Sequence, residues 1–333
     1  EAVAWVPRPP RLAIALRLQR KSRPAAEAIA RAIELDPDSE LAHLELGRIR
    51  LQQKKYDSAQ VMMKAYLADR GSSPEIASLY PQVLSVQGDH AGVIAYLQPL
   101  LAADLAAKRV TPEATLRLLA ASQNQVKDSA GYLATLARLA GNTGKTEYWD
   151  ELINRTVRKD GFADERLRLD VYRLRQVVGI TLEADEIGDM AYRANQAGLP
   201  AEAQALLDDG FKSGLLGKGT NAAADQKLRE SATKAAAQDR ATLADSEAAA
   251  QKAANGNALV GLGMALSSTG AHERGLALIT QGIAKAGLRR ADDAQLHLGL
   301  VALRAGKADQ AKAAFAAVQG ADGAADLARL FKP

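Results

Sequence analysis

The stretch LHLGLVALRAGKADQAKAAFAAV, residues 296–318, decides the fold. Gly299 is followed by Gly306 seven positions later, by Ala311 at twelve and by Phe315 at sixteen. Small residues at the first and twelfth positions allow two helices to pack closely. A glycine between them ends the first helix in the left-handed conformation. The stretch therefore predicts two antiparallel helices joined by a short turn.

The same template recurs along the chain, with first positions 13, 47 and 81 lying 34 residues apart. The further copies are Ala13, Arg20, Ala25 and Ile29; Gly47, Lys54, Ala59 and Met63; Pro81, Gly88, Val93 and Leu97; Ala191, Gly198, Ala203 and Leu207; and Gly263, Gly270, Gly275 and Ile279. Three degenerate stretches, 112–140, 145–179 and 222–255, show only helical apolar periodicity and breaks at Lys127-Asp128, Asp160-Gly161 and Asn255-Gly256. Together these segments predict nine helix pairs.

This pattern resembles the tetratricopeptide repeat (TPR), a helix pair of about 34 residues with a Leu-Gly pair, a following alanine and an aromatic residue. The match is most specific at Leu46-Gly47 with Ala59, and at Leu298-Gly299 with Ala311 and Phe315. The resemblance implies an all-α, right-handed α-solenoid and a role as a protein-binding scaffold. From about Lys127 onward, the chain also looks like uncharacterised exported TPR proteins of Gram-negative bacteria.

Repeat quality divides the chain into five parts. We expect an extended arm at 1–10, three TPR-like repeats at 11–107, degenerate helix pairs at 108–214, a glycine hinge with an alanine-rich helical segment at 215–255, and two repeats with a capping helix at 256–333. Stretch 222–254 is either a thin repeat or one long helix, and the long helix is favoured because neither glycine nor proline interrupts it.

Two further local features carry structural expectations. Pro81 stands where the first helix of its pair needs a small residue, so this helix should kink or begin late. The apolar end with Leu327, Leu330 and Phe331 should pack against Phe315 as a short capping helix, the alternative being a contact with another chain.

The composition is typical of stacked helices, with 47% hydrophobic but only 4% aromatic residues. The formal net charge of +4 combines 43 basic and 39 acidic residues, which is not the concentrated basic stripe of a nucleic-acid-binding domain. The lack of cysteine excludes disulfides and thiol chemistry, and it suits an oxidising compartment. No apolar run reaches the roughly 18 residues of a membrane span.

No catalytic, cofactor-binding or metal-binding constellation is recognisable. The histidines His43, His90, His272 and His297 are scattered over separate repeats. No serine lies in a G-x-S-x-G turn or has a histidine nearby in the sequence to act as a base. Asp185 and Asp292 are interpreted as helix N-caps and first-turn acids. We therefore expect a protein that is not an enzyme and that uses no cofactor.

Candidate partner-binding residues follow from the TPR register, in which the first helix of each pair lines the groove. In the first three repeats these are Arg17, Leu18, Arg48, Leu51, Gln52, Gln82, Ser85 and Val86; in the last two they are Met264, Ser267, Ser268, Leu300, Leu303 and Arg304. Mixed polar and apolar positions suit an extended peptide or a partner helix.

The N-terminal end offers a second candidate surface. Six basic residues and no acid lie between Arg8 and Arg23, among them Arg17, Arg20 and Lys21. The blander interpretation is a solvated helix face; the alternatives are an acidic partner, anionic lipid or nucleic acid, the last being the weakest because no aromatic residue interleaves with the charges. Trp5, on a proline-rich arm, either docks on a partner or packs over the first repeat.

The leading functional hypothesis is a scaffold in the bacterial periplasm or beside a membrane complex, with a cytoplasmic location as the alternative. A component of polysaccharide or outer-membrane export machinery and a nucleic-acid-linked regulator are the other two hypotheses. The chain begins at Glu1 rather than methionine, so we expect that processing or cloning has removed a preceding segment.

Overall fold

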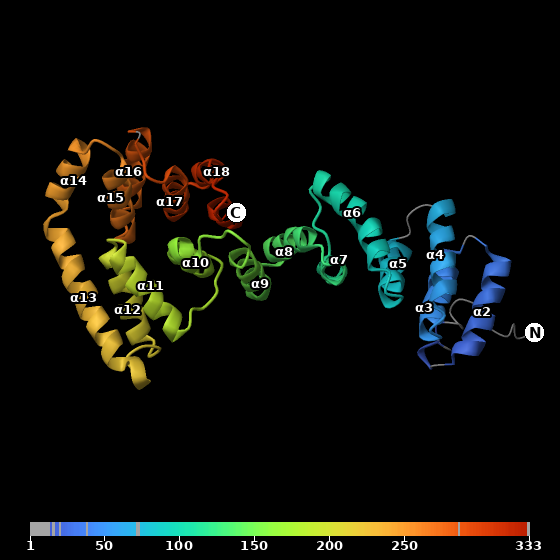
Figure 1. Cartoon of the computed structure of the whole chain (residues 1–333). Coiled ribbons are helices and arrows are strands. Elements are labelled where there is room, and N and C mark those ends of the chain that lie inside the picture. The colour runs from blue at the N-terminus through green and yellow to red at the C-terminus, as the bar shows by residue number, and fades with distance from the viewer. Residues whose placement is uncertain are drawn as a thin grey trace, which may run out of the picture. The chain divides into compact units, whose positions relative to one another are not determined.

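The computed structural model describes residues 14, 17–19, 21–37, 39–70, 74–285 and 287–331. Every regular element in these ranges is helical, and helices follow one another in pairs, as the repeat template predicted. The chain divides into two compact units, residues 1–143 and 144–333 (Figure 1). The all-α solenoid of about nine helix pairs is thus confirmed. Within the described ranges, no helix is both long and apolar enough to cross a membrane.

The first unit stacks its helix pairs in chain order. Its helices are α2 (Ser22–Leu35), α3 (Glu40–Gln52), α4 (Tyr56–Arg70), α5 (Pro74–Val86), α6 (His90–Ala106), α7 (Glu113–Gln125) and α8 (Ser129–Thr143). Ile14, Arg17 and Leu18 are also helical and precede α2. The expected arm at 1–10 lies outside the described residues.

Left-handed residues mark the turns of this unit. Lys54 (φ 58°) and Gly88 (φ 79°) lie seven positions after Gly47 and Pro81, as the template requires. Lys127 (φ 60°) ends α7 in the same way, seven positions after Ala120. The degenerate stretch 112–140 therefore keeps the register of the regular repeats.

Pro81 does not delay its helix. Helix α5 begins at Pro74 and continues through Pro81, so the expected late start is wrong. Pro81 is buried and takes the packing position that a small residue has in the other repeats.

The second unit contains the remaining helices. They are α9 (Thr146–Val157), α10 (Asp164–Val177), α11 (Ala184–Gln196), α12 (Pro200–Lys212), the 3₁₀ turn η1 (Gly219–Asn221), α13 (Ala222–Ala241), α14 (Leu243–Lys252), α15 (Asn257–Ser268), α16 (His272–Ala284), α17 (Ala291–Arg304), α18 (Ala308–Ala316) and α19 (Ala324–Leu330). Asp185 and Asp292 lie in the first turns of α11 and α17, but the N-cap positions belong to Glu183 and Arg290, so the N-cap part of that prediction is wrong.

Glycines of the template hold helix pairs at short distance. A Cβ atom on Gly299 would lie 2.4 Å from the ring of Phe315, and one on Gly47 would lie 2.1 Å from the terminal methyl of Met63. On Gly263 it would lie 2.6 Å from the carbonyl oxygen of Gly275. Position one of the template therefore lies against position sixteen in all three pairs, with Ile279 next to Gly263, and also against position twelve in the pair that begins with Gly263.

The alanine-rich segment is not one long helix. It breaks at Thr242 (φ −104°, ψ 9°), and α13 and α14 follow one another end to end (Figure 1). Helix α13 packs on α12, whereas α14 packs on α15, so the segment changes its packing partner at the break. Because α12 also contacts α15 directly, the segment lies beside the stack instead of adding a helix pair to it.

The chain ends in the short helix α19, which packs on α17 and α18. The rings of Phe315 and Phe331 stack with centroids 5.5 Å apart, and Leu327 is fully buried. Helix α19 also contacts α9 and α10, the first helices of the unit. One continuous core therefore extends from Ile153 to Phe331.

Polar contacts also hold the C-terminal segment against the beginning of unit 2. The Ala163 N–H donates to the Asp322 carbonyl oxygen at 2.8 Å, and the Arg166 guanidinium pairs with the carboxylates of Asp293 and Asp322. We call these four residues the clasp. Unit 2 is consequently closed on itself by contacts between segments far apart in the sequence.

Candidate functional site

The first helices of successive pairs form the inner layer of unit 1. Helix α3 contacts α5, and α5 contacts α7. Among the described residues, the second helices α4, α6 and α8 make no comparable contacts with one another. A stack curves toward the layer whose members touch, so α3, α5 and α7 lie on the inside of the curve.

Side chains that these three helices do not bury form two rows across the inner layer. Using Gly47, Pro81 and Ala120 as equivalent positions, we define the inner ladder as the residues one and five positions later. The first row is Arg48, Gln82 and Ala121, and the second row is Gln52, Val86 and Gln125; all six are exposed. Leu18 continues the second row toward the N-terminus and is 70% exposed.

Electrostatics distinguish the N-terminal end of the ladder. The carboxylate of Glu45, only 1% exposed, accepts hydrogen bonds from Arg17 Nε and Arg48 Nη1, each at 2.7 Å. Two guanidinium groups thus share one buried carboxylate, which leaves one positive charge in excess. The Arg48 side chain is 42% exposed and remains accessible from the groove.

The other partner-binding candidates of the N-terminal repeats differ in how far they are exposed. Gln82 is exposed and donates to the Ser78 carbonyl oxygen at 3.0 Å, whereas Leu51 is half-buried between the rows. Lys21 is exposed immediately before α2. Trp5 and Arg20 lie outside the described residues.

Part of the groove predicted for the last two repeats is filled, whereas Ser268 and Leu303 are half-buried and Arg304 is exposed. Met264, Ser267 and Leu300 are buried, with at most 3% of each residue exposed. They pack inside unit 2 because α12 touches α15 and α19 closes onto α9 and α10. The assignment of these positions to an open groove is therefore wrong.

Arg304 is exposed and pairs with a network of buried charges. Arg173, 2% exposed, donates to the carboxylates of Asp170 and Glu202, with Nη1 lying 2.6 Å from Asp170 Oδ1. Arg304 Nη2 lies 3.2 Å from Glu202 Oε1, and His297 Nε2 lies 3.3 Å from Asp170 Oδ2. The network joins α10, α12 and α17.

Pairing governs the protonation of this network. Burial alone would raise the pKa of Asp170, but the charge and hydrogen bond of His297, together with those of Arg173, hold that pKa well below its usual range. Burial likewise opposes ionisation of Glu202, but Arg173 and Arg304 lower its pKa. Both carboxylates therefore stay ionised in the folded protein at neutral pH.

One serine does lie beside a histidine, contrary to the sequence interpretation. Ser267 Oγ is 3.1 Å from His272 Nδ1 across the turn between α15 and α16. Ser267 is 1% exposed, and both side chains line a pocket of about 410 Å³ together with Glu202 and Arg304. Among the described residues, no group of three or more His, Asp or Glu side chains is placed to hold a metal ion.

Sequence reasoning missed the α7 part of the inner ladder, namely Ala121 and Gln125. The stretch 112–140 lacks the small residue expected in its second helix, so its register was not assigned. The available signal was the spacing from Ala120 to Lys127, because a lysine can take the left-handed role of the turn glycine.

Comparison with known proteins places a repeat family on this part of the chain. A family model described as tetratricopeptide repeat matches residues 19–82, which include Arg48, Gln52 and Gln82. No curated protein matches the chain. Its arrangement is similar to a tetratricopeptide repeat protein from Parabacteroides merdae ATCC 43184, with 10% identity over 98% of each chain and a TM-score of 0.38.

Two solved assemblies are also similar. A structure of Naa15/Naa10 bound to HypK-THB gives 14% identity over 97% of this chain and 54% of that chain, with a TM-score of 0.42. The APC/C hetero-tetramer Cut9-Hcn1 gives 10% identity over 91% of this chain and 64% of that chain, with a TM-score of 0.34.

Proposed function

We propose that this chain is a non-enzymatic scaffold that binds an extended segment of a partner protein along the inner ladder of unit 1. The observation that carries the proposal is the alignment of six exposed side chains in two rows across α3, α5 and α7. The tetratricopeptide match to residues 19–82 supports it, because repeats of this kind expose concave surfaces that bind partners.

The chemistry of the rows favours an extended peptide. Polar amides at Gln52, Gln82 and Gln125 can bond a peptide backbone, while Val86 and Leu18 offer apolar contacts. The excess positive charge at Arg17 and Arg48 favours an acidic residue at that end of the bound segment. The partner is accordingly a mixed polar and apolar segment with an acidic residue near one end.

A selection experiment tests this proposal. Peptides selected from a random library against the full chain should lose affinity about tenfold or more when Val86→Glu and Gln82→Ala are combined, because hot spots cluster near the centre of an interface and these residues lie on α5, the middle helix of the inner ladder. The matched control is Val61→Glu on α4, since Val61 is 69% exposed but lies on a second helix. Peptides that respond to Val61→Glu and ignore the ladder variant would refute the inner ladder as the binding surface.

We further propose that the scaffold acts after export, in the periplasm or beside a membrane complex. The absence of cysteine and the resemblance to exported TPR proteins support this location. Fractionation of the native source should recover the protein with periplasmic or membrane markers. Recovery with cytoplasmic markers alone would contradict the proposal.

A further inference from the structure

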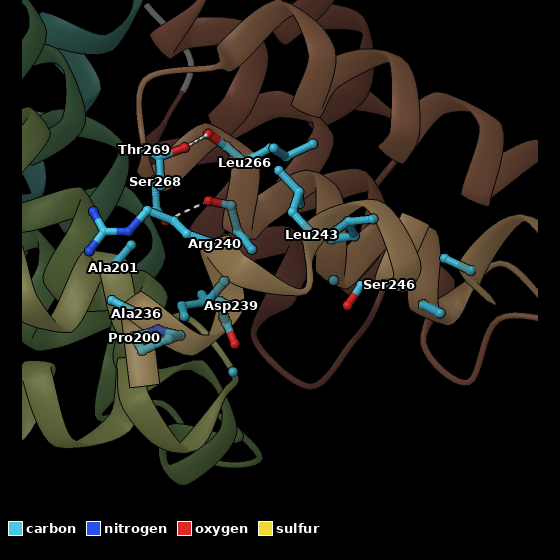
Figure 2. A pocket seen from close by; sticks show the side chains of 17 residues that line it. Pro200, Ala201, Ala236, Asp239, Arg240, Leu243, Ser246, Leu266, Ser268 and Thr269 are labelled. Carbon is cyan, nitrogen blue, oxygen red and sulfur yellow. Dashed lines mark hydrogen bonds between the residues drawn. The ribbon is translucent and has the colours of Figure 1, made fainter. Parts of the chain in front are cut away.

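Unit 2 contains a cavity of about 520 Å³ that the buried charge network does not involve. It lies where α12 begins, where α13 passes into α14, and along one side of α15 (Figure 2). Its walls are mainly apolar and include Leu199, Ala236, Leu243, Leu262 and Ala265. Cavities of this size and composition are typical of small-molecule sites.

The alanine-rich segment explains why this space is not filled. The buried residues of α13 and α14 are all alanines: Ala232, Ala236 and Ala250. The methyl groups of Ala232 and Ala236 on α13 leave space beside them unfilled, whereas α14 packs on α15 beyond the break at Thr242. The cavity is therefore a product of the departure from the regular repeat.

One end of the cavity is positively charged. Arg240 extends its guanidinium toward Ala201 in the first turn of α12, whereas the carboxylate of the neighbouring Asp239 points in another direction (Figure 2). The first turn of α12, which begins at Pro200 without a side-chain cap, forms the wall beside this guanidinium.

We propose that this cavity binds a single-chain anionic amphiphile, with its alkyl chain along α15 and its head group at Arg240. The lining of α15 runs from Ala258 to Thr269, about 16 Å at roughly 1.5 Å per residue, which suits a medium-length alkyl chain. A partner helix, about 10 Å across, is too wide for this space. The site lies in the other unit from the inner ladder and is independent of the proposed function.

Titration of the full chain with dodecanoate, below its micelle concentration, tests the site by calorimetry. Saturable binding of one molecule per chain is expected. Dodecanol should bind more weakly, because it gains no charged contact with Arg240. Arg240→Gln should lower the affinity for dodecanoate about tenfold and change the affinity for dodecanol by no more than about twofold. The control Lys234→Gln on the same helix should change neither affinity.

A second variant fills the cavity. Ala258 is exposed and lines the cavity, so Ala258→Phe should occupy it without disturbing the core. Binding of both ligands should fall about tenfold or more, with unchanged helicity by circular dichroism. The proposal is overturned if dodecanoate shows no saturable binding, if Ala258→Phe leaves it unchanged, or if Arg240→Gln weakens both ligands equally.

Discussion

At the scale of single residues, the unusual feature is a group of charges inside a repeat protein. Asp170, Arg173 and Glu202 are nearly inaccessible to water, yet each has an oppositely charged partner. Such a group contributes little net stability when complete, but removing one member leaves an unpaired buried charge. The network therefore specifies how α10, α12 and α17 fit together.

The network predicts a loss of stability in acid. The pKa values of Asp170 and Glu202 are lowered by folding, so their contribution is complete above the usual carboxyl pKa of about 4 and is lost as pH falls below it. Urea unfolding should show a falling free energy from about pH 4 downward. Asp170→Asn should cost about 3–5 kcal/mol at pH 7 and reduce this acid dependence. The exposed control Asp245→Asn should do neither. If the free energy of unfolding falls equally steeply with pH in both variants, the network is not the cause of the acid dependence.

Two glycines of α15 predict opposite effects of the same substitution. Gly263→Ala should destabilise by about 1–3 kcal/mol, because the new Cβ would lie 2.6 Å from the Gly275 carbonyl oxygen. Gly261→Ala, with nothing within 4 Å, should stabilise the helix by up to about 1 kcal/mol. Thermal unfolding measures both. Similar shifts for the two variants would rule out close helix packing as the role of Gly263.

At the scale of elements, packing partners determine where the helices end and turn. The alanine-rich segment has the propensity of a long helix, but α13 packs on α12 whereas α14 packs on α15. The loss of helical continuity at Thr242 is the consequence of these two contacts. Helix α19, in contrast, is short and is held by its apolar side chains and by the clasp.

The clasp predicts that α19 opens when Arg166 is changed. Arg166 pairs with Asp293 of α17 and with Asp322, which precedes α19. Arg166→Gln should increase amide hydrogen exchange in α19 at least about tenfold, corresponding to a local loss of about 1.4 kcal/mol. Arg168→Gln is the control, since Arg168 pairs with Asp164, four residues away on the same helix. Unchanged exchange in α19 would show that its apolar contacts suffice.

At the scale of the whole molecule, the helices of the two units contact one another in different ways. The second unit has a continuous core from Ile153 to Phe331 with contacts between its two ends. The first unit is a stack in which each pair depends on its neighbours. The division of the chain into two units follows from the contacts between the two ends of the second unit.

This difference predicts the behaviour of the separated units. A fragment of residues 144–333 should unfold in one cooperative transition, with circular dichroism and near-ultraviolet signals coinciding. A fragment of residues 1–143 should unfold over a broader range, because stacked repeats fray from their ends. Non-coincident transitions in the 144–333 fragment would contradict a single core.

Much of this organisation follows from local signals in the sequence. The spacing of Gly47, Lys54 and Met63 predicted a helix pair, its turn and its close contact, because small residues and left-handed turns act within one repeat. The same register placed Arg48, Gln52 and Gln82 on one surface. The roles of Trp5 and of the basic run between Arg8 and Arg23 remain predictions. Trp5 lies outside the described residues, and so does part of the basic run.

Only the tertiary structure shows which groove positions of the second unit are buried. The same register that exposes Gln82 buries Met264 and Leu300, because α19 and the clasp bring the ends of the unit together. The pairing of Asp170 with His297, 127 residues away, likewise has no local signal. Periodicity determines which faces of a helix can pack, but contacts between distant segments determine which of those faces remain open to a ligand.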